Sequence, residues 1–181
     1  MARILGIDPG SIKTGFGVID VTASGMVYIA SGIIRLPAVS LPEKLKIIHD
    51  SVSEIIGEHR PDEMAVEEVF FARDPRAALK LGQARGAAIV AGARRDLPVA
   101  EYSARTVKQS VVGNGGAGKE QVQHMVVRLL NLPGLPREDA ADGLAVALCH
   151  GQSLRTVATL GRASVGRTQY ARGRLREIAG K

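Results

Sequence analysis

The sequence predicts an α/β protein with a mixed five-stranded sheet and helices on both faces of that sheet. The chain has 181 residues, the length of a single domain. Three segments rich in branched apolar residues open it and are typical of neighbouring strands. Helical and extended patterns then alternate, in the order α, β, α, β, α, α, α. A strand meander followed by strands that are joined through helices indicates this architecture.

The first half of the chain is predicted to hold four strands and one helix. Apolar residues recur at helical spacing over Leu41–His59, and Pro61 ends that pattern. A turn at Pro9-Gly10-Ser11 separates the first two extended segments. We expect the strands at Arg3–Asp8, Lys13–Val21, Met26–Leu36 and Glu63–Val69.

The second half is predicted to be mainly helical. Pro75–Asp96 is rich in Ala and Leu and reads as a long helix, and a strand at Leu97–Tyr102 follows it. Ser103 is a suitable N-cap for the next helix. We expect the three remaining helices at Ala104–Val112, at Glu120–Leu130 after a glycine loop, and from Pro136 to about Leu154.

Composition excludes several classes of protein. The longest uncharged run, Val21–Ile34, has 14 residues, fewer than the ~18 apolar residues of a membrane span. The apolar run at the N-terminus ends at Asp8, too early for a signal peptide. A single cysteine, Cys149, excludes an intramolecular disulfide and the common zinc frameworks. We therefore expect a cytoplasmic protein without a membrane partner.

The net charge of +6 is concentrated at the C-terminus. Residues 153–181 hold seven of the 24 basic residues and one of the 18 acidic residues, Glu177, so the rest of the chain is balanced. Basic tails most often bind nucleic acid, although a solubilising tail has the same composition. We expect a folded domain over residues 1–154 and a basic, flexible tail over residues 155–181.

Four carboxylates stand where a shared site could form. Asp8 ends the first strand, Glu67 lies late in the fourth, and Asp139 and Asp142 are three residues apart on the last helix, hence on one face. If the first and fourth strands are neighbours, all four converge. Such an oxygen-only cluster suits two Mg²⁺ ions, or Mn²⁺ in their place, and two ions can drive phosphodiester hydrolysis. Taken singly, Asp139 also fits a helix N-terminus, and Glu67 and Asp142 also fit exposed positions.

Several motifs in register resemble the RuvC family of Holliday-junction resolvases. They extend from Arg3 to His150 without a large gap, and a weaker similarity continues at 171–176. The matching segments are Gly6-Ile-Asp-Pro-Gly-Ser11, Thr14-Gly-Phe-Gly17, Ala65-Val-Glu-Glu-Val-Phe70, Ala78-Leu-Lys-Leu-Gly-Gln-Ala-Arg-Gly86, Val107-Lys-Gln-Ser-Val-Val-Gly113, Gln121-Val-Gln-His-Met125 and Asp139-Ala-Ala-Asp142.

This resemblance implies a ribonuclease-H-like fold and a homodimer that cuts four-way DNA junctions in recombination and repair. It implies Mg²⁺-dependent paired nicks that leave 5′-phosphate and 3′-hydroxyl ends, and a branch-migration motor complex as a partner. The metal-binding catalytic positions of the family fall on Asp8, Glu67, Asp139 and Asp142.

The resemblance also implies DNA contacts. Lys119 matches the basic active-site residue of the family, where it would stabilise charge on the scissile phosphate. Lys108 matches a second basic position, and Phe70 matches an aromatic residue that stacks on junction bases. Arg73 and Arg76 near the long helix fit either a DNA-facing stripe or a solvated face. One local departure is Glu68, a second carboxylate where an amide is common in the family; on a strand it points away from Glu67.

Other functions remain open on the residues alone. A non-catalytic junction-binding module would lack one of the acids, and a ribonuclease H acting on RNA–DNA hybrids would share them. An actin-like ATP-binding protein would need about twice this length. Gly113–Lys119 fits the start of a nucleotide-binding loop, but Glu120 stands where Ser or Thr would meet Mg²⁺. His124 falls in a matching segment, which places it near the expected site, whereas the other histidines lack ligand spacing and are expected at the surface or in the core.

Overall fold

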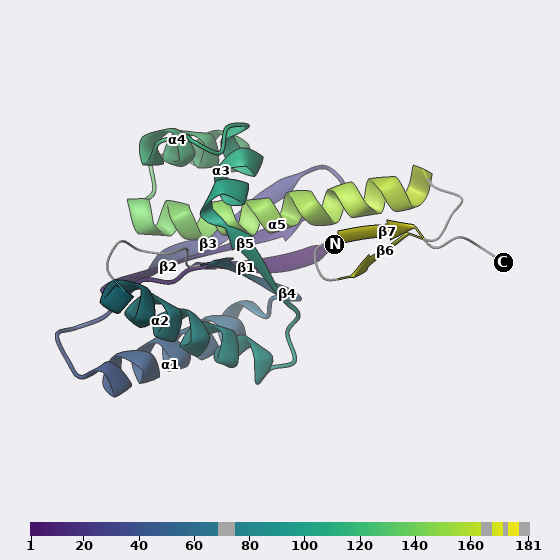
Figure 1. Ribbon diagram of the computed structural model, residues 1–181. Coiled ribbons are helices and arrows are strands. Elements are labelled where there is room, and N and C mark those ends of the chain that lie inside the picture. The colour runs from purple at the N-terminus through teal and green to yellow at the C-terminus, as the bar shows by residue number, and fades with distance from the viewer. Residues whose placement is uncertain (69–74, 164–167, 172–173, 178–181) are drawn as a thin grey trace.

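The sheet is mixed and five-stranded, with the strand order β3-β2-β1-β4-β5 (Figure 1). The computed structural model describes residues 1–68, 75–163, 168–171 and 174–177, and side chains as far as residue 159. Strands β1 (Ala2–Asp8), β2 (Lys13–Val21) and β3 (Met26–Arg35) form an antiparallel meander. Strands β4 (Glu63–Glu68) and β5 (Val99–Ser103) extend it in parallel with β1. The predicted sheet is confirmed.

Helices cover both faces of the sheet, as Figure 1 shows. On one side lie α1 (Leu41–His59) and α2 (Pro75–Ala93), and on the other lies the long α5 (Glu138–Ala163). Two short helices, α3 (Ala104–Val112) and α4 (Lys119–Leu130), pack on α5. One apolar cluster therefore fills the space beneath α5 and a second fills the space beneath α1 and α2.

Glycines allow α5 to lie directly on the meander. A Cβ atom on Gly17 of β2 would come within 2.6 Å of the Leu144 backbone, and one on Gly143 would come within 2.6 Å of the Phe16 backbone. Real Cβ atoms are not found at such distances. Side chains at these two positions would push the helix off the sheet, so the glycines set the height at which the acidic start of α5 stands over β1 and β2.

The predicted boundaries agree with the structure to within a few residues, except at the C-terminus. The helix expected to end near Leu154 continues to Ala163, and no proline or glycine stands between Leu154 and Gly161. Beyond it are two short antiparallel strands, β6 (Thr168–Ala171) and β7 (Arg174–Glu177). The last helix thus extends beyond its expected end, into the segment that was expected to be a basic, flexible tail. Within the described residues, no helix is long and apolar enough to cross a membrane.

Candidate active site

Parallel pairing of β1 with β4 brings two of the predicted acids together. Ile7 lies opposite Val66 in this register, so Asp8 and Glu67 follow at the adjoining carboxyl ends of the two strands. The apolar residues before them are buried in the sheet. The strands thus deliver both carboxylates to one edge of the core, and the condition for their convergence, that the first and fourth strands are neighbours, is met.

The third and fourth acids come from the first two turns of α5. Asp142 lines the same pocket as Asp8 and Glu67, and its side chain is 22% exposed. Asp139 lies one turn earlier at the rim, 32% exposed, with Oδ2 3.3 Å from the Nζ of Lys13 on β2. The structure therefore gathers three of the four acids in one pocket and places the fourth beside it in an ion pair.

The pocket is a cleft of about 260 Å³ between the sheet, α5 and the α3–α4 pair. Its floor is acidic and one wall is basic, since Lys108 of α3 and Lys119 of α4 also line it. Apolar side chains close the remaining sides. The residues that line it are Asp8, Glu67, Ala104, Val107, Lys108, Lys119, Val122, Asp142 and Ala145.

Burial and mutual repulsion make the carboxylates hard to ionise. Burial, reinforced by the charges of Glu67 and Asp142, raises the pKa of Asp8 to about 8. Burial and the charge of Asp142 likewise raise the pKa of Glu67 to about 7. Burial also raises the pKa of Asp142. A cation in this pocket would relieve both effects at once.

Lys119 is held at the mouth of the pocket by a residue that the sequence analysis did not single out. Its Nζ lies 2.5 Å from Oε1 of Glu138 and 3.9 Å from Oδ2 of Asp142. The hydrogen bond to Glu138 raises the pKa of Lys119. Glu138 adjoins the acidic motif in sequence, but nothing in its spacing marked it as the partner of a lysine 19 residues earlier.

The donors of the pocket suit hard divalent cations. All are carboxylate oxygens, and oxygen-only sites favour Mg²⁺ and Mn²⁺ over soft metals. As the side chains stand, no group of three or more His, Cys, Asp or Glu residues in the described part of the chain is arranged to hold a metal ion. The fit rests on the chemistry and the crowding of the carboxylates, with the Lys119 ammonium near the mouth offsetting part of their charge.

The predicted DNA contacts are only partly covered by the structure. Phe70 and Arg73 lie outside the described residues. Arg76 is exposed in the first turn of α2 and does not line the acidic pocket. Glu68 and His124 also lie outside its lining. Of the predicted DNA-binding residues, Lys108 and Lys119 are thus the ones that the structure brings to the acids.

His150 belongs to a buried polar network rather than to the acidic pocket. It is 5% exposed, and its ring lies 2.8 Å from the Tyr102 hydroxyl through Nδ1 and 2.9 Å from Oε2 of Glu63 through Nε2. These contacts tie α5 to β4 and β5. His150 was expected either at the surface or in the core, and the structure places it in the core.

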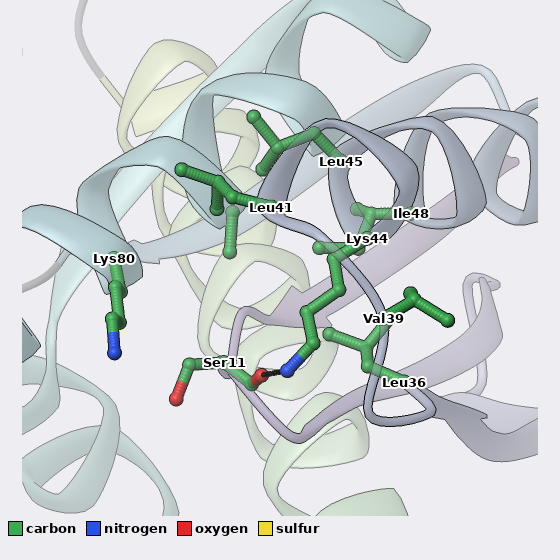
Figure 2. A pocket seen from close by; sticks show the side chains of 9 residues that line it. Ser11, Leu36, Val39, Leu41, Lys44, Leu45, Ile48 and Lys80 are labelled. Atoms are coloured by element: carbon green, nitrogen blue, oxygen red, sulfur yellow. Dashed lines mark hydrogen bonds between the residues drawn. The ribbon is translucent and has the colours of Figure 1, made fainter.

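A second pocket, on the α1–α2 side of the sheet, has a different character. Its volume is about 170 Å³, and its lining is mainly aliphatic (Figure 2). Figure 2 shows Lys44 extended across it, where Nζ donates to the backbone oxygen of Ser11 at 3.4 Å. Among the described residues, no carboxylate lines it, so this pocket does not share the acids of the first one.

Acids at the ends of β1 and β4 and at the start of a helix, over a meander extended by two parallel strands, define an α/β protein of the ribonuclease-H-like class. The model of the family "Crossover junction endodeoxyribonuclease RuvC" matches residues 4–150. The chain belongs to the RuvC family.

Relatives and solved structures agree with this assignment. The crossover junction endodeoxyribonuclease RuvC of Idiomarina loihiensis is 58% identical over 97% of this chain and 100% of its own length. That of Teredinibacter turnerae is 54% identical over 96% and 99%. The structure of Thermus thermophilus RuvC in complex with a Holliday junction substrate superposes with a TM-score of 0.80 at 36% identity, over 86% of this chain and 96% of that one.

Proposed function

We propose that this protein is an endodeoxyribonuclease that resolves four-way DNA junctions by paired nicks, with Asp8, Glu67, Asp139 and Asp142 as its catalytic carboxylates. The observation that carries the proposal is the shared pocket of Asp8, Glu67 and Asp142 beside Lys119, in a chain of the RuvC family. The Thermus thermophilus relative is described with a Holliday junction as its substrate.

The carboxylates would hold divalent cations, Mg²⁺ first among them. Bound cations would supply an activated attacking water and neutralise the leaving oxygen. Asp8 and Glu67 are fixed by adjacent strands and Asp142 by a helix packed on glycines, so their oxygens are held on a rigid frame. Asp139 at the rim would join them once its pairing with Lys13 gives way.

Lys119 and Lys108 would hold the scissile phosphate against these acids. The Lys119 ammonium stands at the mouth of the pocket, where a phosphate oxygen would accept a hydrogen bond from it. A charged donor aimed at developing negative charge stabilises the transition state in a partly dry site. The products would be a 5′-phosphate and a 3′-hydroxyl, which can be ligated.

The proposal includes a homodimer, because a four-way junction presents two equivalent strands to be cut. Two large apolar side chains on α2 support it: Leu79 is 67% exposed and Val90 is 50% exposed. They are eleven residues apart and therefore lie on one stripe of the helix. A Leu79→Arg variant is expected to sediment as a monomer, whereas a Leu135→Arg variant, changed at an exposed leucine in the loop before α5, is expected to keep the size of the wild type.

The proposed setting is the cytoplasm, with a branch-migration motor complex as a partner of the resolvase. Cys149 is a free, buried thiol, which is common in proteins of reducing compartments. Phe70, Arg73 and Arg76 remain the proposed contacts to junction DNA near the start of α2.

The substrate class is tested with three end-labelled nucleic acids: a four-way junction, a linear duplex of the same sequence and an RNA–DNA hybrid. Each is incubated with the protein in Mg²⁺, in Mn²⁺ and in EDTA. Symmetric nicks in the junction alone, dependent on the metal, are expected. Preferential cutting of the hybrid would replace the proposal with a ribonuclease H. Junction binding without cutting under either metal would reduce it to a binding module.

A further inference from the structure

The free edge of the sheet, beside the acidic pocket, carries three basic side chains. Strand β3 is an outer strand. Arg35 ends it, Lys13 begins its neighbour β2 directly opposite, and Arg137 immediately precedes α5. We refer to Lys13, Arg35 and Arg137 as the β3-edge cluster.

All three side chains lie on the α5 side of the sheet. Ile34 and Leu36 are buried in the apolar cluster beneath α1 and α2, so Arg35 between them faces the opposite way. Lys13 shares that face because it is the cross-strand partner of Arg35. Arg35 and Arg137 line one hollow of about 310 Å³ between β3 and the start of α5.

The backbone at this edge is also available to a ligand. The amide of Leu36 donates to the carbonyl of Ile12 at 2.9 Å, which makes these opposing residues a hydrogen-bonded pair. Pairs alternate along an antiparallel ladder, so the N–H and C=O groups of Arg35 and Ile33 point away from β2, toward the open edge.

The cluster has more positive than negative charge. Lys13 is paired with Asp139. Neither Arg35 nor Arg137 forms an ion pair with a carboxylate in the described part of the chain, and both are exposed. Like charges at cross-strand positions repel, so an anion that bridges Lys13 and Arg35 would be favoured.

We propose that the β3-edge cluster binds backbone phosphates of the junction strand next to the acidic pocket. This inference rests on the proposed nuclease function. Asp139 connects the acidic pocket with the cluster. Its charge helps to raise the pKa of Asp8, and its carboxylate is also the ion-pair partner of Lys13. A strand that enters the pocket would therefore meet Lys108 and Lys119 in its lining and the β3-edge cluster beside it.

DNA is the occupant that these observations favour over an acidic protein segment. The cluster adjoins the acidic pocket through the Lys13–Asp139 pair, where the DNA backbone must already pass. Arginine forks and free backbone amides also match phosphate oxygens. When cations neutralise Asp139, Lys13 would exchange that carboxylate for a phosphate.

The test compares two variants that lose the same charge. Arg35→Gln/Arg137→Gln alters the cluster, and Arg94→Gln/Arg95→Gln alters two exposed arginines just beyond α2, on the opposite side of the sheet. Junction affinity is measured in EDTA, without cutting, across about 50–200 mM salt. The logarithm of affinity falls with the logarithm of salt concentration, and each lost phosphate contact makes the slope of this fall less steep by about 1. The cluster variant is expected to lose about 2 from this slope, and the control variant close to none.

A second arm locates the contact. Neutral methylphosphonates replace the phosphates on one side of the cut and then those on the other. Replacement on one side is expected to weaken the wild type and to leave the cluster variant no weaker than it already is. The proposal would be overturned if the replacement weakened the wild type and the cluster variant equally, or if it weakened neither. If it weakened neither, an acidic protein would be the remaining candidate for the edge. Wild-type protein that neither binds nor cuts junctions would instead overturn the nuclease function itself.

Discussion

Lys119 at the first residue of α4 is bound to Glu138 at the first residue of α5, with 2.5 Å between Nζ and Oε1. The same ammonium lies 3.9 Å from Asp142. This pair joins the starts of two helices across the mouth of the acidic pocket. Both side chains are more than half exposed, so the pair adds little to stability. The role of the pair is to hold the Lys119 ammonium at the mouth of the pocket, where a phosphate must enter.

Removing the charge of Lys119 should impair cutting far more than binding. We expect Lys119→Met to lower the single-turnover rate of junction cleavage by about 100-fold, the usual effect of losing one donor to developing charge. Glu138→Gln keeps the lysine but loosens it, and a decrease of only a few-fold is expected. Quenched cleavage time courses at saturating protein give both rates. A larger loss for Glu138→Gln than for Lys119→Met would mean that Glu138 acts directly.

The metal-free protein should become less stable as the pH rises. The pKa of Asp8 is raised from 3.8 to about 8 and that of Glu67 from 4.5 to about 7. Between the lower, unfolded-state pKa of each carboxyl group and its raised pKa in the folded state, the folded protein holds a proton that the unfolded protein has lost. Raising the pH through this range therefore favours unfolding. We expect Tm in EDTA to fall by at least about 4 °C between pH 5 and pH 8, beyond the change seen in Asp8→Asn.

Mg²⁺ should reverse that trend, because ionised carboxylates bind the cation and protons compete with it. The gain in Tm on adding Mg²⁺ is expected to be larger at pH 8 than at pH 5, and to disappear in Asp8→Asn. A gain that is independent of pH and persists in the variant would place the cation elsewhere.

The glycine contacts beneath α5 should be needed for both stability and cutting. A Cβ at position 143 would collide with the Phe16 backbone, so Gly143→Ala is expected to cost about 1–3 kcal/mol. The same change would shift the start of α5, which carries Asp142 in the pocket and Asp139 at its rim, and should lower cleavage. Gly57→Ala is the matched control: it lies at an exposed position of α1 with nothing within 4 Å of the added atom. That control should be neutral or slightly stabilising in a denaturant titration, with normal cleavage.

Much of the fold followed from local pattern. The bounds of β2, α1 and α3 agree with the expectation residue for residue, because hydrophobic period and flanking turns or caps coincide there. Ser103 caps α3 as expected, accepting a hydrogen bond from the Thr106 amide. The end of α5 did not follow, since the uninterrupted helix-compatible stretch after Leu154 was taken as part of the charged tail.

The site was predictable in its acids but not in their partners. Asp8 and Glu67 required only that two apolar strands be neighbours. The links Lys119–Glu138 and Lys13–Asp139 depend on how helix starts meet the sheet, and no sequence spacing encodes such a meeting. For the same reason the β3-edge cluster could not be predicted from the sequence, because it depends on the strand register that places Arg35 opposite Lys13.

The most direct measurement is junction cleavage by Asp8→Asn, read beside its junction affinity in the same buffer with Mg²⁺. The substitution removes one carboxylate from the pocket and leaves its size nearly unchanged. We predict that symmetric nicking falls by at least about 1,000-fold, while the dissociation constant for the junction changes by less than about three-fold, since the lost group acts on the reacting phosphate rather than on affinity. Cleavage at wild-type rates by a folded Asp8→Asn protein would contradict the assignment of the acidic pocket as the catalytic centre.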